Sequence, residues 1–377
     1  MWPRTDFVEL VGLTHPIVQA PMSGFTPPPL AAAVCNAGAL GSIGCAGIPP
    51  GVVREQVTAL RQSTNRPFNL NFFVHTAPRI AAETTARVRA RLKPYFDEFE
   101  LGPVPEPKEP FPTFDDERLD LVLELRPRVV SFHFGLPAAS VVQRIKGAGC
   151  IILSSATTVS EARSLQAKGA DAIIAQGYEA GGHRGSFTDS PGAGMVGTMA
   201  LAPQIVDAVH VPVIAAGGIA DGRGIAAAFA LGASGVQLGT AFLGCPEATV
   251  SPLHRAQLRT ATDDCTELTR AFTGRAARAI RNRFITEMAD CESLEFPLQG
   301  SLAGPLWQLP SDEARAAFTP LWAGQVARLM RDLPAGRLIE TLVAEAQRVI
   351  EPKGSAGDTG SPDGSAIIAP SNRSPAA

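Results

Sequence analysis

Residues 212–240 read PVIAAGGIADGRGIAAAFALGASGVQLGT and contain the pattern that decides the fold. Two short apolar runs, Val213–Gly218 and Gly235–Thr240, enclose an alanine-rich segment, Asp221–Gly232, which begins with a helix-capping residue and ends with glycine. Short apolar runs bounded by glycine are typical of buried parallel strands, and the segment between them is typical of a crossover helix. The stretch therefore predicts a strand, a helix and a second strand of one parallel sheet.

The same pattern recurs six times on the amino-terminal side of this unit. The further runs are residues 16–21, 40–45, 68–74, 129–135, 151–157 and 172–177. Most neighbouring runs begin 21 to 28 residues apart, which fits one strand and one helix, whereas two intervals of 61 and 41 residues mark insertions. Eight such units in about 240 residues match the usual size of a (β/α)8 TIM barrel. A doubly wound open sheet is the alternative, although such sheets more often stop at about five to seven strands.

The two long intervals divide the chain into a barrel and a second part. We expect residues 1–75 and 128–250 to form the barrel, and residues 76–127 and 251–350 to form a mostly helical lid. The first lid segment follows the third strand, so it should leave the barrel at the end where (β/α)8 enzymes carry their active sites. Residues 351–377 are rich in glycine, serine and proline, which predicts a disordered tail.

Within the expected lid, residues 79–92 form a charged helical pattern and residues 321–333 form an amphipathic one. Between the first of these and the next strand lies a proline-rich connector, GPVPEPKEPFP (residues 102–112), which is expected to lack regular structure. We expect the two lid segments to pack together.

Composition favours a small-molecule partner. The chain has 377 residues, 45% of them hydrophobic, and 33 Lys and Arg against 36 Asp and Glu leave a formal charge of −3, which disfavours nucleic-acid or membrane partners. No apolar stretch reaches the roughly 20 residues that cross a bilayer. Asp6 and Glu9 lie where a signal peptide would be apolar, so we expect a cytoplasmic protein. The six cysteines include no C-x-x-C pair, so neither a metal site nor a disulfide framework is predicted.

Glycines end both strands of the opening unit. Gly217 and Gly218 follow one strand, and Gln237, Gly239 and Thr240 end the next. Glycine lets the backbone approach an anion closely, and the loops after the seventh and eighth barrel strands often form a phosphate site. Tight turns without a ligand are the alternative, but glycines at both adjacent strand ends favour a phosphate.

Two histidines are candidates for chemistry at the same end of the barrel. His183 lies in the glycine-rich loop after the sixth strand, where an imidazole can act as a base near neutral pH or orient an anion. By its position alone, a surface-loop histidine is equally consistent. His133 lies near the end of the fourth strand, where it either faces the pocket or is a hydrogen-bonded core residue.

Other residues at the strand ends and in the lid leave two questions open. Met22 follows the first strand and Asn69 lies on the third, where backbone groups and amides suit a ring with alternating donors and acceptors, such as a flavin isoalloxazine. Taken alone, a methionine such as Met22 is more often a core residue. Four arginines of the lid predict a solvated helix face, with recognition of an anionic substrate as the alternative; they are Arg275, Arg278, Arg281 and Arg283.

Longer motifs resemble those of the nitronate monooxygenase family, formerly called 2-nitropropane dioxygenases, whose members are FMN-dependent barrel enzymes. The matching barrel motifs are PIVQAPMSG (16–24), FNLNFF (68–73), SFHFG (131–135), QGYEAGGHRG (176–185), PVIAAGGIADGRG (212–224) and GVQLGTAFLGCPE (235–247). Two lid motifs also match, FTGRAARAIRNRF (272–284) and LWAGQ (321–325). The resemblance covers nearly everything before residue 350.

The resemblance implies a cofactor site and a catalytic residue. His183 corresponds to the family's candidate base, and His133 is expected to help shape the substrate pocket. The FMN ring and phosphate are expected to contact Met22, Asn69, Gln176, Gly181, Gly217, Gly218, Gln237, Gly239 and Thr240.

The resemblance also implies a reaction, the oxidation of an alkyl nitronate with molecular oxygen to a carbonyl compound and nitrite. Propionate 3-nitronate is one candidate substrate, and a homo-oligomer is compatible with the resemblance. An NAD(P)H-dependent flavin reductase acting on quinones or enoyl thioesters is the alternative enzyme, because related flavin barrels share the Gly-Gly-His segment. A barrel that only binds a phosphate ligand is the non-enzymatic alternative.

Overall fold

Eight parallel strands form a barrel at the centre of the computed structural model, which describes residues 1–188, 192 and 194–351. The strands are β1 (Ile17–Gln19), β2 (Gly41–Gly44), β3 (Phe68–Phe73), β4 (Val129–His133), β5 (Ile151–Ala156), β6 (Ala172–Gln176), β8 (Val213–Ala216) and β9 (Gly235–Leu238). Their hydrogen-bonded order is β1-β9-β8-β6-β5-β4-β3-β2, and a parallel bridge from Val18 to Leu40 joins the two ends of this series. The predicted (β/α)8 TIM barrel is therefore confirmed, and the open sheet is excluded.

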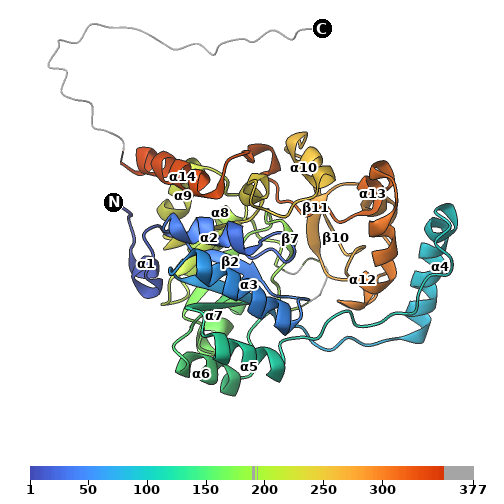
Figure 1. The fold of residues 1–377 in the computed structure, drawn as a ribbon, viewed down its shortest axis with the longest axis horizontal. Coiled ribbons are helices and arrows are strands. Elements are labelled where there is room, and N and C mark those ends of the chain that lie inside the picture. Colours follow the sequence, from blue (N-terminus) through green and yellow to red (C-terminus); the bar gives the residue numbers. More distant parts are fainter. Residues whose placement is uncertain (189–191, 193, 352–377) are drawn as a thin grey trace, which may run out of the picture.

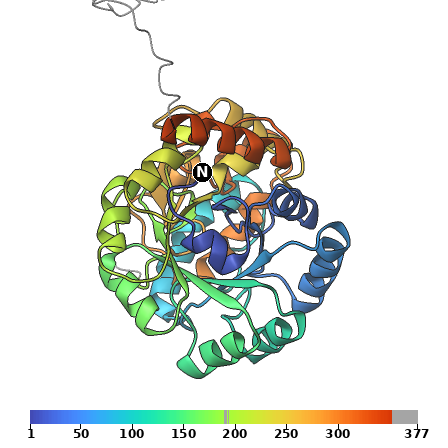
Figure 2. The same cartoon turned by 90° about the vertical axis from the view of Figure 1, so that its left-hand side faces the viewer.

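A ring of helices surrounds the barrel, as Figure 2 shows. Its members are α2 (Pro28–Asn36), α3 (Pro50–Ser63), α5 (Asp116–Leu125), α6 (Ala139–Gly147), α7 (Val159–Ala167), α8 (Thr198–Val206), α9 (Gly222–Ala230) and α14 (Ala335–Ile350). Helix α5 packs against α3 and α6, and α14 packs against α9 and α2, so both belong to the ring although they fall in ranges assigned above to the lid. The short helix α1 (Asp6–Val11) shares a buried cluster with strand residues such as Val18, Val129 and Ile214.

Alternation along the strands separates the side chains that pack against the helices from those that point into the barrel, and the inward-facing set includes both apolar and polar residues. On β3, Leu70 and Phe72 belong to the buried cluster between strands and helices. Because successive side chains of a strand point to opposite faces, Asn69 and Asn71 point into the barrel. There the Asn69 amide donates a hydrogen bond to Ser42 Oγ at 3.0 Å, whereas its carboxamide oxygen is buried without a partner among the described residues.

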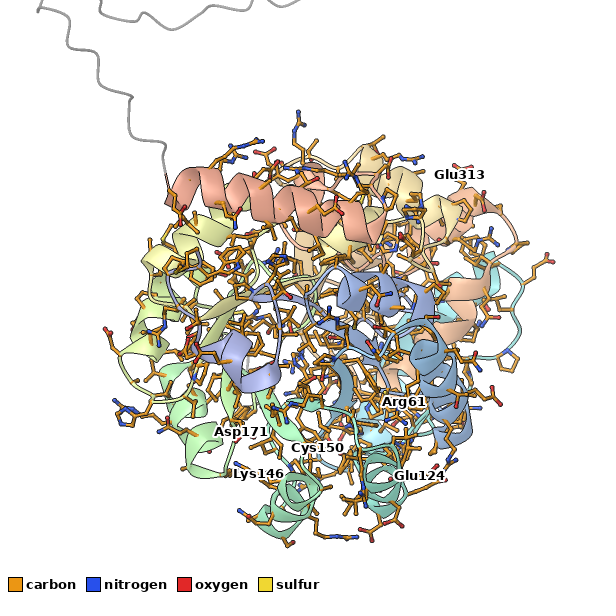
Figure 3. The ribbon with its side chains drawn as sticks, turned by 60° about the vertical axis from the view of Figure 1, so that its left-hand side comes forward. Arg61, Glu124, Lys146, Cys150, Asp171 and Glu313 are labelled. Carbon is orange, nitrogen blue, oxygen red and sulfur yellow. The ribbon has the colours of Figure 1, made fainter. Side chains whose placement is uncertain are left out.

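An ion pair fastens part of the helical ring to the strands. The Lys146 ammonium at the end of α6 donates to Asp171 Oδ1 at 2.7 Å, and both residues are labelled in Figure 3. The second carboxylate oxygen of Asp171 accepts the backbone N–H of Ile152 at 2.8 Å. Asp171 directly precedes β6, so one carboxylate holds together α6, β5 and β6.

The lid lies at one end of the barrel, on the right in Figure 1. Its elements are α4 (Ala82–Glu98), α10 (Pro252–Arg259), β10 (Thr266–Thr269), β11 (Ala277–Ile280), α11 (Arg283–Glu287), α12 (Leu298–Ala303) and α13 (Asp312–Phe318). Helix α4 is the charged helix expected near residues 79–92, with its end at Glu98. Leu92 and Phe96 of α4 share a buried cluster with Phe284 and Phe318, so the two lid segments pack together as expected.

The lid contains a small antiparallel sheet that the sequence analysis did not predict. Strand β10 pairs with β11, and β11 pairs with β7 (Gly182–His183), which belongs to the loop after β6. The helix predicted for residues 321–333 is wrong, because only a short 3-10 turn, η3 (Ala327–Leu329), forms there. Trp322 instead forms an antiparallel bridge with Ala279 of β11, so pairing with the sheet overrides the local amphipathic pattern.

The remaining segments agree with the sequence pattern where they are described. The proline-rich connector at residues 102–112 has no helix or strand, as predicted. The predicted tail lies outside the described residues, apart from Glu351. In the described part of the chain, each helix is too short or too polar to cross a membrane. The finer division into barrel and lid stays a prediction.

Candidate active site

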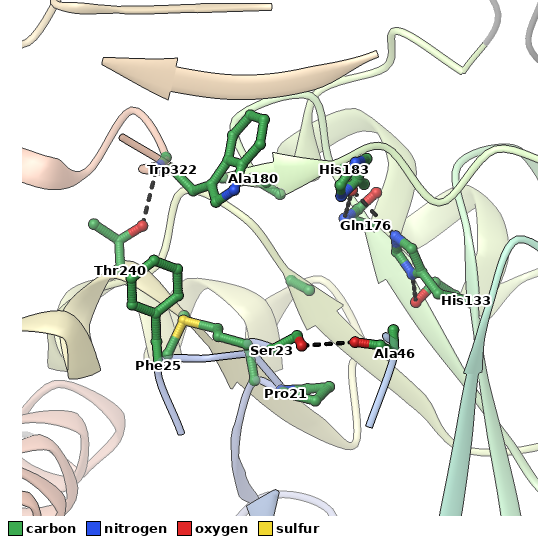
Figure 4. A pocket seen from close by; sticks show the side chains of 18 of the residues that line it. Pro21, Ser23, Phe25, Ala46, His133, Gln176, Ala180, His183, Thr240 and Trp322 are labelled. Atoms are coloured by element: carbon green, nitrogen blue, oxygen red, sulfur yellow. Dashed lines mark hydrogen bonds between the residues drawn. The ribbon is translucent and has the colours of Figure 1, made fainter. Parts of the chain in front are cut away.

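A cavity of about 470 Å³ lies between the carboxyl ends of the barrel strands and the lid (Figure 4). This volume falls within the roughly 300–1,000 Å³ that is usual for small-molecule sites. Residues at or just beyond the ends of all eight strands line it, and the lid contributes Phe111, Thr273, Phe296, Trp307 and Trp322. The strand ends of the barrel therefore form one side of the cavity, and the lid forms the other.

His183 lines this cavity and is held in place by its strand and by the lid. Strand β7 pairs His183 with Ala277 of β11, and the His183 Nε2 atom lies 3.0 Å from Thr273 Oγ1. Burial lowers the pKa of His183 to about 3, and the neighbouring His133 and the Arg275 guanidinium lower it further. The imidazole is therefore neutral at physiological pH, and the surface-loop alternative is excluded.

Aromatic rings enclose the His183 imidazole. The ring centroids of Phe296 and Trp322 lie 5.3 and 5.5 Å from the imidazole centroid, and those of Phe73 and Phe134 lie at 5.8 and 6.1 Å. These rings exclude water from one side of the imidazole and explain why burial dominates its pKa.

His133 faces the same cavity and supports the His183 backbone. Its Nε2 atom lies 3.1 Å from the carbonyl oxygen of His183, and its Nδ1 atom lies 3.0 Å from Ser155 Oγ. Because a carbonyl can only accept, Nε2 carries the proton and Nδ1 accepts from the Ser155 hydroxyl. Burial lowers the pKa of His133 to about 4, which keeps this neutral tautomer.

Gln176 and Arg184 fix the loop that carries His183. The Gln176 amide donates to the carbonyl of His183 at 3.0 Å, and its Oε1 accepts the N–H of Gly185 at 2.7 Å. The guanidinium of the buried Arg184 donates to the carbonyls of Gln176 and Gly194 at 3.0 and 2.8 Å. The backbone of His183 is thus held by Gln176 and His133 together, so its position does not depend on the lid alone.

The glycine-rich ends of β8 and β9 form the opposite side of the cavity. Gly217 and Gly218 have φ angles of 101° and 72°, a left-handed backbone that favours glycine. Thr240, which follows β9, accepts the backbone N–H of Gly324 through its Oγ1 at 2.9 Å. The 3-10 helix η1 (Thr240–Gly244) begins at this point, so the arrangement is the loop and short-helix geometry that binds phosphate in many barrels.

The structure brings most of the predicted cofactor residues into this one cavity. Those that line it are Met22, Gln176, Gly181, Gly217, Gly218, Gln237, Gly239 and Thr240. The carboxamide oxygen of Gln237 is buried and has no hydrogen-bond partner among the described residues. At Gly181 a Cβ atom would lie 2.5 Å from Gly324 N, so only glycine allows the loops to approach this closely.

Asn69 is the exception, because it does not line the cavity. Its neighbour Asn71 does, since that residue is one inward-facing position closer to the carboxyl end of β3. The sequence analysis assigned the contact to Asn69, the deeper of the two amides of β3. Asn71 donates to Ser131 Oγ at 3.0 Å, which parallels the bond from Asn69 to Ser42 one layer below.

The four lid arginines divide into two kinds, and the predicted solvated helix face is wrong for two of them. Arg275 and Arg278 are 7% and 1% exposed, because they precede and lie on strand β11 rather than a helix. Arg278 stacks on the Tyr178 ring, 4.4 Å from its centroid, and donates to the Tyr178 carbonyl at 3.0 Å. Arg281 and Arg283 are the solvated pair and form surface ion pairs.

Comparisons with known proteins agree on one family over nearly the whole chain. A family model described as "Nitronate monooxygenase" matches residues 4–345. The chain is 41% identical to "Nitronate monooxygenase" of Paraburkholderia phytofirmans, over 92% of this chain and 96% of that protein. It is 42% identical to "Nitronate monooxygenase" of Pseudomonas aeruginosa, over 90% of this chain and 98% of that protein. The crystal structure of nitroalkane oxidase from Streptomyces ansochromogenes superposes with a TM-score of 0.84 at 39% identity, covering 93% of this chain and 100% of that one.

Proposed function

This chain belongs to the nitronate monooxygenase family, and we propose that it binds FMN and oxidises nitronates with molecular oxygen to carbonyl compounds and nitrite. One observation carries the proposal: a single cavity joins the neutral, enclosed His183 to the glycine-rich ends of β8 and β9. The family assignment argues against the non-enzymatic alternative, because the relatives that the chain matches are named as monooxygenases.

The residues around the cavity fit FMN. The backbone of Gly217, Gly218, Gly239 and Thr240 would hold the phosphate, because the left-handed glycines turn successive peptide groups around one point. The unpartnered Gln237 oxygen offers a hydrogen-bond acceptor at the cavity wall, where a buried polar group needs a partner. When bound, FMN supplies the electron-transfer chemistry of the reaction. Met22, Gln176 and Gly181 would complete the site, whereas Asn71 replaces Asn69 as the amide closest to it.

The neutral His183 favours a substrate that is already an anion. A group whose pKa is lowered to about 3 is a poor base for a neutral nitroalkane near pH 7, because proton transfer to it is uphill. A nitronate has already lost that proton. We therefore assign His183 the role of positioning the nitronate through its Nδ1 atom, because its Nε2 atom is held by Thr273 Oγ1.

The stoichiometry of the proposed reaction balances without an added reductant. Two nitronate anions and one O2 contain the same atoms and charge as two carbonyl molecules and two nitrite ions. An NAD(P)H-dependent reductase would instead consume one reduced nicotinamide for each substrate molecule. The two enzyme functions therefore differ in a quantity that can be measured.

A spectrum followed by oxygen uptake tests the proposal. The purified protein should show flavin absorbance, release FMN on denaturation, and consume oxygen with ethyl nitronate in the absence of NADPH. Rapid anaerobic bleaching of the flavin by NADPH, without bleaching by the nitronate, would favour the reductase. A protein that stays colourless after incubation with FMN would contradict the cofactor assignment.

A further inference from the structure

The lid side of the cavity is aromatic and uncharged. Around His183 it is formed by Phe111, Phe296, Trp307 and Trp322, and Gly300 lies among them. We call this part of the cavity the aromatic compartment.

Apart from the two histidines, Glu179 is the one ionisable residue among the described residues that line the cavity. Its carboxylate is already occupied, since it accepts the N–H of Thr198 at 2.9 Å and the Thr198 hydroxyl at 2.9 Å. Glu179 therefore holds the start of α8, and its negative charge cannot attract an anionic ligand. No lysine or arginine of the described chain lines the cavity.

The Arg275 guanidinium lies near the histidines and stacks on the Phe134 ring. Its guanidinium carbon is 3.8 Å from the centroid of Phe134, and the imidazole centroid of His183 is 6.1 Å from that same ring. The guanidinium also donates to the Ser186 carbonyl. Its charge lowers the pKa of both histidines, but Arg275 is not among the residues that line the cavity.

The walls of the aromatic compartment brace one another. The Phe296 ring packs against Phe111 and Phe134 with centroid distances of 5.9 and 5.6 Å. At Gly300 a Cβ atom would meet the Trp307 ring at 3.6 Å, an ordinary contact, so the glycine leaves that indole open to the cavity. A ligand group in this space therefore meets fixed aromatic surface.

We propose that the aromatic compartment selects nitronates with an uncharged, apolar alkyl or aryl substituent over nitronates that carry a second negative charge. This inference rests on the proposed function and names its substrate class. Removing apolar groups from water favours binding, whereas burying a carboxylate beside no cation opposes it. The indole N–H of Trp307 is buried without a partner among the described residues and is a neutral donor, which does not supply the opposite charge that a buried carboxylate needs. Propionate 3-nitronate, which carries such a carboxylate, is then a poor substrate.

A pair of substrates of the same shape tests this directly. The nitronate of 3-methyl-1-nitrobutane replaces the carboxylate of propionate 3-nitronate by an isopropyl group of similar size. With the FMN-loaded protein, kcat/KM should be at least about a hundredfold higher for the isopropyl compound. Along the series from nitroethane to 1-nitropentane, kcat/KM should rise about fourfold for each methylene, which corresponds to ~0.8 kcal/mol. Equal or higher kcat/KM for propionate 3-nitronate would overturn the inference.

Two variants at one position separate charge from size. Gly300→Lys and Gly300→Met place side chains of similar length in the aromatic compartment, and the backbone at Gly300 lies in helix α12 with no left-handed φ angle. The lysine variant should raise the ratio of kcat/KM for propionate 3-nitronate to that for its isopropyl analogue at least tenfold above the methionine variant. Equal ratios would contradict the inference, because a cation introduced into the aromatic compartment would then have no effect on selection.

A binding measurement keeps this inference separate from the proposed function. Nitrobenzene and 4-nitrobenzoate have no α-proton, so their Kd can be measured without turnover from the quenching of Trp307 and Trp322 fluorescence. Nitrobenzene should bind at least tenfold more tightly, and equal affinities would contradict the aromatic compartment as a selector. Failure of every nitronate to react, with nitrobenzene still preferred, would instead refute the proposed function alone. Turnover of nitronates without discrimination would refute only the selectivity.

Discussion

Replacing His254 by asparagine tests how strongly buried neutral histidines limit stability in acid. His254 lies on α10, is 2% exposed, and packs its ring 5.6 Å from that of Phe25 at the cavity wall. Burial lowers its pKa to about 4, opposed by a hydrogen bond to the backbone of Trp322 and assisted by Arg255. In the unfolded chain the pKa returns to about 6.5.

The sign and the size of the effect follow from these two pKa values. Between about pH 6.5 and pH 4 the unfolded chain binds a proton that the folded chain does not, so the free energy of unfolding falls as the pH falls. The stabilisation is fully present above pH 6.5 and decreases toward pH 4. At pH 5 the loss amounts to about 2 kcal/mol for this one residue, from ~1.4 kcal/mol per pKa unit.

Urea unfolding near pH 7 and near pH 5, at one fixed FMN concentration, measures the difference. His254→Asn should lose about 2 kcal/mol less than the wild-type protein between the two pH values, whatever the substitution costs at neutral pH. His210→Asn, at an exposed position, is the matched control and should lose as much as the wild-type protein. An unchanged loss in His254→Asn would refute the reasoning.

Three other substitutions probe the site itself. His183→Ala should retain bound FMN and lose most nitronate turnover, and full turnover would contradict its assigned role. Thr273→Val removes the hydroxyl 3.0 Å from His183 Nε2 and should lower kcat/KM, measured by oxygen uptake, about two- to tenfold, the equivalent of ~0.5–1.5 kcal/mol. Gly181→Ala would place Cβ 2.5 Å from Gly324 N, so this variant should have a lower Tm and bind FMN more weakly. Gly51→Ala is the control and should be neutral or stabilising, because no atom lies within 4 Å of its Cβ. Equal Tm values for the two variants would count against the close approach at Gly181.

The barrel could be predicted from the sequence because its signals are local. Each strand is a short apolar run whose burial needs only its own residues, such as Val213–Ala216 after Pro212 and before two glycines. The lid sheet could not be predicted in the same way. Strand β7 has two residues, and its partner β11 lies about ninety residues away, so neither segment carries a period that reveals the pairing.

The candidate site was predictable where it depends on strand ends and not where it depends on the lid. His183 and the glycines after β8 occupy positions that the barrel topology alone brings together. The sequence does not show which inward-facing residue of β3 lies at the level of the cavity, so it could not decide between Asn69 and Asn71. Phe296 and Trp322 come from distant lid segments, so their contact with His183 follows from tertiary packing that no local pattern encodes.

The ratio of nitrite formed to oxygen consumed tests the central claim most directly. With ethyl nitronate, FMN-loaded protein and no nicotinamide, the proposed reaction predicts two nitrite ions for each O2, at a rate that depends on His183. A requirement for NADPH, or oxygen uptake without nitrite, would contradict the assignment of this cavity to nitronate oxidation.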